Sequence, residues 1–149
     1  MLQIKCAVKG VFIAVNEASA IPAVVLTDDQ GRMLPIFVGL WEAISINSAQ
    51  NNEVPPRPLT HDLFLELMAQ YSITVCSMSI DSIDEGIYYA HLVLSSSGHE
   101  DCLDCRPSDG IAIALRANAP IFAGEDILAS GTTNVNVSEM VALSTFLRS

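Results

Sequence analysis

The sequence predicts an α+β fold, a single domain over residues 1–149 in which a mixed, mostly antiparallel sheet packs against helices. Three observations lead to this prediction. The chain has 149 residues, 50% of them hydrophobic, with a mean hydropathy of +0.40, so it can bury a sizeable core. Runs rich in Val and Ile come in pairs joined by Asp- and Gly-containing turns. Amphipathic segments stand between these pairs instead of following every strand.

The first half of the chain contains three predicted strands and two helices. The strands cover residues 2–15, 20–28 and 33–38, and the helices cover residues 40–51 and 60–71. The turn at 28–32 joins the second and third strands as a hairpin. Pro35 cannot donate to a sheet ladder, so it predicts an edge strand or a bulge. Three prolines make residues 53–58 an extended loop between the helices.

The second half repeats the hairpin pattern and ends in helices. Strands are predicted at 73–81, 87–95, 101–105, 121–123 and 132–138, a turn at 84–86, a loop at 95–100, a helix at 109–117 and a helical turn over EDILAS. Ser138 is then expected to cap a final amphipathic helix, in which four apolar residues turn inward: Met140, Leu143, Phe146 and Leu147.

The charge balance argues against several classes of protein. The net charge is −10, and the seven Lys and Arg residues are scattered, which is a poor starting point for binding nucleic acid. A polyanion would have to meet a local site or be bridged by divalent cations. No apolar run approaches the roughly 20 residues that span a bilayer, so we expect no membrane helix. The N-terminus lacks the features of a signal peptide, and we expect a cytoplasmic protein.

A doubled phrase is the most distinctive feature of the sequence. "RPLTHD" begins at Arg57 and "RPSD" begins at Arg106. Thr60 and Ser108 are predicted helix N-caps, which would place Asp62 and Asp109 in the first turns, where a negative charge is favourable. An N-cap does not need a preceding arginine, so the two arginines call for a separate explanation.

Two explanations of the arginines fit the sequence. Each arginine can pair with the aspartate of its own phrase, Arg57 with Asp62 and Arg106 with Asp109, and so brace the entry to its helix. Alternatively, the two helix N-termini converge and the guanidinium groups form one site for phosphate or carboxylate.

Two further side chains join this set of candidates. His61 follows Thr60 directly and belongs to the only residue type whose ordinary titration falls near neutral pH. Glu42 is the only acidic residue between Asp29 and Glu53, and it marks one face of an apolar helix.

The cysteines suggest a weaker hypothesis. His99, Cys102 and Cys105 have a spacing found in zinc sites, but a structural zinc site needs four closed ligands and no second pair lies nearby. Buried or inert thiols are the alternative, and in the cytoplasm all four cysteines would be reduced.

The stretches "LPIFVGLWEAISI", "RPLTHDLFLELM", "IDEGIYYAHLVL" and "DCRPSDGIAIALRANAPIFAGEDIL" resemble the bifunctional nuclease domain family over about residues 4–147. The resemblance implies an α+β domain that often self-associates, and plant members of the family cut both DNA and RNA. The motif residues that the resemblance carries over are Glu42, Arg57, Pro58, Thr60, His61, Asp62, Asp104, Arg106, Pro107, Ser108 and Asp109. The family usually has Ala where this chain has Gly110, which costs about 1 kcal/mol of helix propensity.

The first functional hypothesis is a nuclease that hydrolyses phosphodiester bonds of DNA or RNA. Glu42, Asp62 and Asp109 would hold a divalent cation such as Mg²⁺ or Mn²⁺. Phosphate would be bound by the arginines and the two helix starts: Arg57, Thr60, Arg106 and Ser108. His61 would shuttle a proton.

Two other hypotheses remain open. The same helix starts could serve a non-catalytic regulatory module that binds a small anion or a protein partner. The chain could also be an assembly protein, because 50% hydrophobic and only 16% charged residues leave apolar surface to bury. In every case we expect a homo-oligomer, most simply a two-fold dimer.

Overall fold

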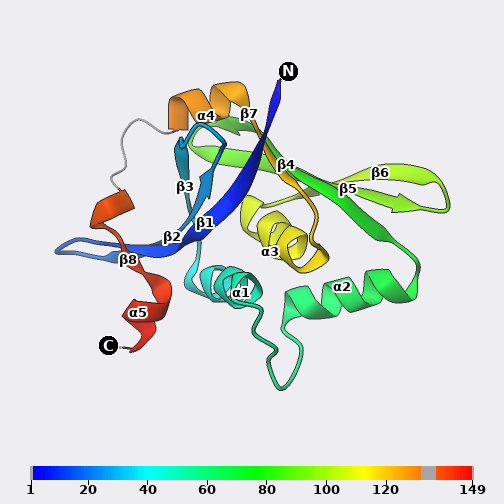
Figure 1. The fold of residues 1–149 in the computed structure, drawn as a ribbon, viewed down its shortest axis with the longest axis horizontal. Helices are drawn as coiled ribbons and strands as arrows, with labels where there is room; N and C mark the ends of the chain where they lie inside the picture. Colours follow the sequence, from blue (N-terminus) through cyan, green and yellow to red (C-terminus); the bar gives the residue numbers. More distant parts are fainter. Residues whose placement is uncertain (1, 132–136, 149) are drawn as a thin grey trace.

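The computed structural model describes residues 2–131 and 137–148, and it has the predicted α+β architecture (Figure 1). The described strands are β1 (Gln3–Val15), β2 (Ala20–Thr27), β3 (Met33–Phe37), β4 (Thr74–Asp84), β5 (Ile87–Ser96), β6 (His99–Cys105), β7 (Ile121–Gly124) and β8 (Val141–Ala142). The helices are α1 (Leu40–Gln50), α2 (Thr60–Gln70), α3 (Pro107–Ala117), α4 (Glu125–Gly131) and α5 (Leu143–Arg148), with a 3₁₀ turn at Val137–Glu139.

Within the described residues the strands form one sheet in the order β3-β2-β1-β7-β4-β5-β6, with β8 paired to β1. Every described pairing is antiparallel except that of β4 with β7. The sheet is therefore mixed and mostly antiparallel, as predicted. β3 lies at one edge of the sheet and pairs with β2, which confirms the edge position expected from Pro35. Proline has no backbone N–H, and an edge strand tolerates this because one of its sides has no neighbouring strand to bond.

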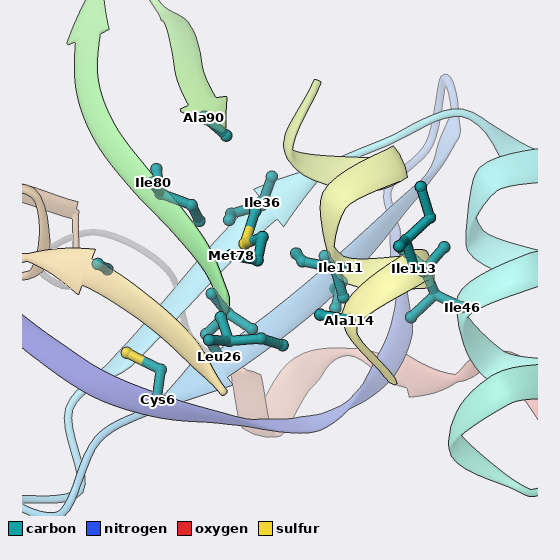
Figure 2. Packing of buried hydrophobic residues seen from close by; sticks show 14 of the residues in the cluster. Cys6, Leu26, Ile36, Ile46, Met78, Ile80, Ala90, Ile111, Ile113 and Ala114 are labelled. Atoms are coloured by element: carbon teal, nitrogen blue, oxygen red, sulfur yellow. The ribbon is translucent and has the colours of Figure 1, made fainter. Parts of the chain in front are cut away.

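Helix α3 occupies the centre of the core. It packs on β4 and β5, with α1 and α2 against its other sides. Its Ile111, Ala112, Ile113 and Ala114 are all buried, so the helix has no wide polar face. Figure 2 shows Ile111 facing Met78 of β4 while Ile113 lies beside Ile46 of α1. This packing brings the N-termini of the three helices to one side of the sheet.

The predicted loop at 95–100 is wrong. β5 continues to Ser96 and β6 begins at His99, so Ser97 and Gly98 form a two-residue turn. Both turn residues have positive φ, 53° and 75°, the backbone conformation of a tight hairpin with the right-handed twist of its strands. Three consecutive serines disguised this turn, because serine is not a residue that usually adopts positive φ.

The predicted end of the chain is also partly wrong. The strand expected at 132–138 falls mostly on residues outside the described part of the chain. Ser138 lies in the 3₁₀ turn, and the last helix begins only at Leu143, because Val141 and Ala142 pair with β1. Leu143 is fully buried as predicted, but Phe146 and Leu147 are 37% and 51% exposed. None of the helices in the described ranges is long and apolar enough to cross a membrane.

Candidate functional site

The N-terminal turns of α1, α2 and α3 border one open cleft of about 410 Å³. We call it the Trp41 cleft, after the large apolar side chain of its wall that is 78% exposed. Its polar lining comes from Glu42 and Ser45 of α1, Thr60 and His61 of α2, and Arg106 and Asp109 at the start of α3. Five of the eight site residues predicted from the sequence therefore line the same cleft: Glu42, Thr60, His61, Arg106 and Asp109.

The predicted N-caps are wrong by one or two positions. The N-cap residues are Leu59 for α2 and Arg106 for α3, so Thr60 is the first helical residue of its helix and Ser108 the second residue of α3. At α3 the shift follows from Pro107, whose fixed φ suits the first helical position. At α2 the carboxylate of Asp62 accepts a hydrogen bond from the Leu59 backbone N–H at 2.9 Å, so a threonine cap is not needed.

Arg106 is held between two carboxylates. Its Nε and Nη2 donate to Asp109 Oδ2 and Oδ1 at 2.9 and 3.1 Å, which confirms the predicted pair within the second phrase. Its Nη1 donates to Glu42 Oε1 at 3.3 Å, which links α3 to α1. The Arg106 side chain is 63% exposed. Three of its N–H groups are used in these contacts, and a guanidinium has five, so two remain for a ligand.

His61 connects α2 to both neighbouring helices. Its Nε2 lies 2.8 Å from Asp109 Oδ1, and its Nδ1 lies 2.6 Å from Ser45 Oγ. The Ser45 oxygen also accepts a hydrogen bond from Arg116 Nη2 at 3.1 Å, which leaves the serine hydroxyl free to donate to Nδ1. These roles assign the neutral ring its proton on Nε2, where it is donated to Asp109. Because both nitrogens are engaged, the ring orients Asp109 instead of facing the cleft with a free nitrogen.

The charge state of Asp109 follows from these neighbours. Burial by itself would raise the pKa of this carboxyl, but the hydrogen bonds from Arg106 and His61 outweigh burial and lower the pKa below its usual value. Asp109 is therefore ionised at neutral pH. A carboxylate of low basicity is better suited to binding a cation or an N–H donor than to removing a proton.

The predicted pair of Arg57 with Asp62 is wrong. Asp62 Oδ1 accepts from Arg116 Nε at 2.7 Å, and this ion pair borders a separate depression. Arg57 is exposed in the loop before α2, does not line the Trp41 cleft, and makes no hydrogen bond or ion pair within the described ranges. Ser108 is 6% exposed and lines a second cleft on the far side of Arg106.

Sequence reasoning missed Arg116 and Ser45. The Arg116 side chain is only 9% exposed and also donates to the backbone oxygens of Ala112 and Ser45, at 3.0 and 3.2 Å. One signal was present: Arg116 follows Asp109 by seven residues, two helical turns, so both face the same side of α3. Ser45 likewise lies one turn after Glu42 on α1.

The three carboxylates proposed as metal ligands do not gather at one point. Glu42 and Asp109 share Arg106, whereas Asp62 is bound to Arg116. Within the ranges 2–131 and 137–148 no group of three or more His, Cys, Asp or Glu side chains is arranged to hold a metal ion. Two carboxylates still match the usual mode of Mg²⁺, which binds one or two carboxylates together with substrate phosphate and waters.

The zinc hypothesis for the cysteines fails on strand geometry. Cys102 and Cys105 are three residues apart on β6, so their side chains point to opposite faces of the sheet. Burial, with a further contribution from Asp109, raises the pKa of the Cys105 thiol to about 11, which keeps it protonated. The alternative of inert thiols fits this arrangement.

Comparison with known proteins identifies relatives across most of the chain. The family model of the bifunctional nuclease domain matches residues 24–136, a span that contains every residue of the Trp41 cleft. An uncharacterised protein of Mycobacterium tuberculosis is 38% identical over 123 residues, 82% of this chain and 73% of that protein. Bifunctional nuclease 1 of Oryza sativa subsp. indica is 33% identical over 104 residues, 66% of this chain, and that of Arabidopsis thaliana is 32% identical over 105 residues, 67% of this chain. These matches cover only 31% and 32% of the plant proteins.

Proposed function

Because this chain belongs to the bifunctional nuclease domain family, we propose that it is a nuclease that hydrolyses phosphodiester bonds of DNA or RNA with the help of a divalent cation. The observation that carries the proposal is the position of Arg106. This largely exposed guanidinium stands at the open side of a cleft, between two carboxylates, with N–H groups left for a phosphate oxygen.

The local charge explains why a cation is part of the proposal. Glu42 and Asp109 carry two negative charges against the single positive charge of Arg106. One negative charge is left over, which would repel a phosphodiester at contact distance. A bound Mg²⁺ or Mn²⁺ would reverse the sign of the cleft, neutralise charge on the phosphate and activate a water molecule.

Four residues of the Trp41 cleft then have separate roles. Glu42 and Asp109 would hold the cation, and Arg106 would bind a non-bridging phosphate oxygen. His61 fixes the orientation of the Asp109 carboxylate through the 2.8 Å hydrogen bond from its Nε2–H. This role replaces the proton shuttle expected from the sequence, because neither ring nitrogen of His61 is free in this arrangement.

The test is cleavage of a fluorescently labelled RNA or DNA oligonucleotide with and without Mg²⁺ or Mn²⁺. Asp109→Asn and Glu42→Gln should each lose activity while remaining folded. Asp126→Asn, which changes an exposed carboxylate on α4, is the matched control and should keep it. Cleavage that is unchanged by EDTA and by Asp109→Asn would refute the assignment.

A second function is favoured by the exposed apolar surface and by the hydrogen bonds that occupy both ring nitrogens of His61. Trp41, Leu63, Leu67 and Tyr71 on α1 and α2 are each more than half exposed. A homo-oligomeric module that binds a small anion or a protein partner without turnover would use such a surface for association. Stabilisation by phosphate with a divalent cation, in the absence of any cleavage, would favour this function.

In either case we propose a cytoplasmic location, where the four cysteines would stay as the free thiols seen in the structure.

A further inference from the structure

Arg106 separates two clefts, and only one of them contains the carboxylates. The second cleft, of about 440 Å³, lies between the end of β3, the turn from β4 to β5 and the start of α3. We call it the Phe37 cleft. Its apolar wall includes Phe37, Ile87 and Tyr88, and Arg106 lines it as well as the Trp41 cleft. In Figure 1 the end of β3 runs directly into α1, and Phe37 is the last residue of β3 while Trp41 is the second residue of α1.

Both aromatic side chains are unusually open to solvent for their size. Trp41 is 78% exposed and Phe37 is 52% exposed. A single exposed aromatic residue needs no explanation, but here one lines each of the two clefts that share the exposed Arg106 of the proposed reaction centre. Only Val38, Gly39 and Leu40 separate the two residues along the chain, so the two clefts lie close together.

This arrangement matches the chemistry of an unpaired nucleic-acid strand. A phosphate would lie on Arg106, and the bases before and after it would reach the two apolar clefts. Aromatic side chains bind bases by stacking, and stacking does not depend on net charge. A chain with a net charge of −10 cannot rely on a basic groove, so stacking would supply affinity that its few cations cannot.

We propose that Trp41 and Phe37 are base-stacking positions on the two sides of Arg106, and that they select strands with unpaired bases. The proposal rests on the proposed nuclease function and deepens it by naming a substrate class. Bases in a duplex are already stacked on each other, and their faces cannot reach the two clefts without unpairing. A duplex should therefore bind much more weakly than a single strand of the same sequence.

Trp41 is the only tryptophan in the chain, so its fluorescence reports directly on the cleft that carries its name. The experiment titrates the protein with a single-stranded octanucleotide and with its duplex, using Ca²⁺ in place of Mg²⁺ to slow cleavage. The single strand should quench the fluorescence and the duplex should not. Among the described residues, Arg106 is the one Lys or Arg side chain that lines either cleft, so the affinity for the single strand should depend only weakly on salt concentration.

Variants locate the stacking positions. Phe37→Ala should weaken binding of the single strand about 5- to 150-fold, the equivalent of ~1–3 kcal/mol for one stacked base. Trp41→Ala, followed by anisotropy of a labelled oligonucleotide, should have a similar effect. Tyr89→Ala is the matched control, because Tyr89 on β5 is 46% exposed and lines neither cleft. Its affinity should be unchanged.

Three results would overturn the inference: equal quenching by duplex and single strand, equal affinities for the Phe37 and Tyr89 variants, or a fluorescence change that follows protein concentration alone. The last would mean that a second copy of the chain covers Trp41. A protein that binds single strands in this manner but never cleaves them would refute the proposed function and leave the stacking positions standing. Cleavage that is unaffected by both aromatic substitutions would refute the stacking positions and leave the proposed nuclease function standing.

Discussion

Arg116 is the residue whose loss should reveal how the three helices are held together. Its buried guanidinium donates to the carboxylate of Asp62 and to the side chain and backbone of Ser45, besides closing a turn of its own helix. Arg116→Ala removes these hydrogen bonds at once and leaves the largely shielded Asp62 carboxylate, 29% exposed, without its cation. Breaking a fully buried pair costs ~3–5 kcal/mol, and the residual exposure of Asp62 brings the expected loss of unfolding free energy to about 3 kcal/mol.

The matched control is Arg106→Ala. This arginine also makes ion pairs, to Glu42 and Asp109, but it is 63% exposed, so its removal should cost only about 0–1 kcal/mol. Urea unfolding followed by circular dichroism gives both values. In a thermal melt the Arg116 variant should lose roughly 6–12 °C, at about 2–4 °C per kcal/mol for a chain of this size. A loss below about 1 kcal/mol, or one equal to that of Arg106→Ala, would show that the contacts of Arg116 do not join the helices as described.

The remaining predictions concern pH, packing and association. Burial would raise the pKa of Asp62, but the hydrogen bond from Arg116 outweighs burial and lowers it below the usual 3.8. The stabilisation by the Asp62–Arg116 pair is therefore complete above pH 3.8 and is lost as the pH falls toward the lowered pKa that Asp62 has in the folded protein. Over this acidic range the urea midpoint should fall less steeply in Arg116→Ala than in the wild type. Gly110→Ala adds helix propensity, yet the new Cβ would lie 2.9 Å from Met78 Cγ and Cε and 3.0 Å from Cys105 Sγ. We therefore expect the free energy of unfolding to fall by about 1–2 kcal/mol. An unchanged or higher melting temperature would contradict this packing. Sedimentation at micromolar concentration should give at least twice the 16.0 kDa chain mass, whereas a monomer mass would rule out association.

The sheet was predictable because its signals are local. Partial alternation of apolar and polar residues and an Asp-Glu-Gly turn predict β4 and β5 without reference to the rest of the fold. The hairpin at Ser97 and Gly98 was missed because its turn depends on a serine with positive φ, which composition does not reveal. The end of the chain was misjudged because the pairing of Val141 with Ile13 is a long-range contact that competes with helix formation.

The candidate site also has one part that could be predicted from local sequence and one part that could not. The pair of Arg106 with Asp109 lies within one helical turn and follows from spacing alone. The partner of Asp62 could not be read from its phrase, because the choice between Arg57 and Arg116 depends on how α2 packs against α3. Arg57 stays in the loop, whereas Arg116 is carried by the buried face of α3 into contact with Asp62.

Reciprocal contacts between α2 and α3 explain the doubled phrase. Each phrase places an aspartate in the first turn of its helix, Asp62 in α2 and Asp109 in α3. Each aspartate is then held by a donor from the other helix: Arg116 of α3 reaches Asp62, and His61 of α2 reaches Asp109. The contacts are reciprocal, and Ser45 of α1 joins them by bonding to both His61 and Arg116. Two similar helix starts are needed because each supplies the acid that fixes the other, and the exposed Arg106 remains as the cation that faces the cleft.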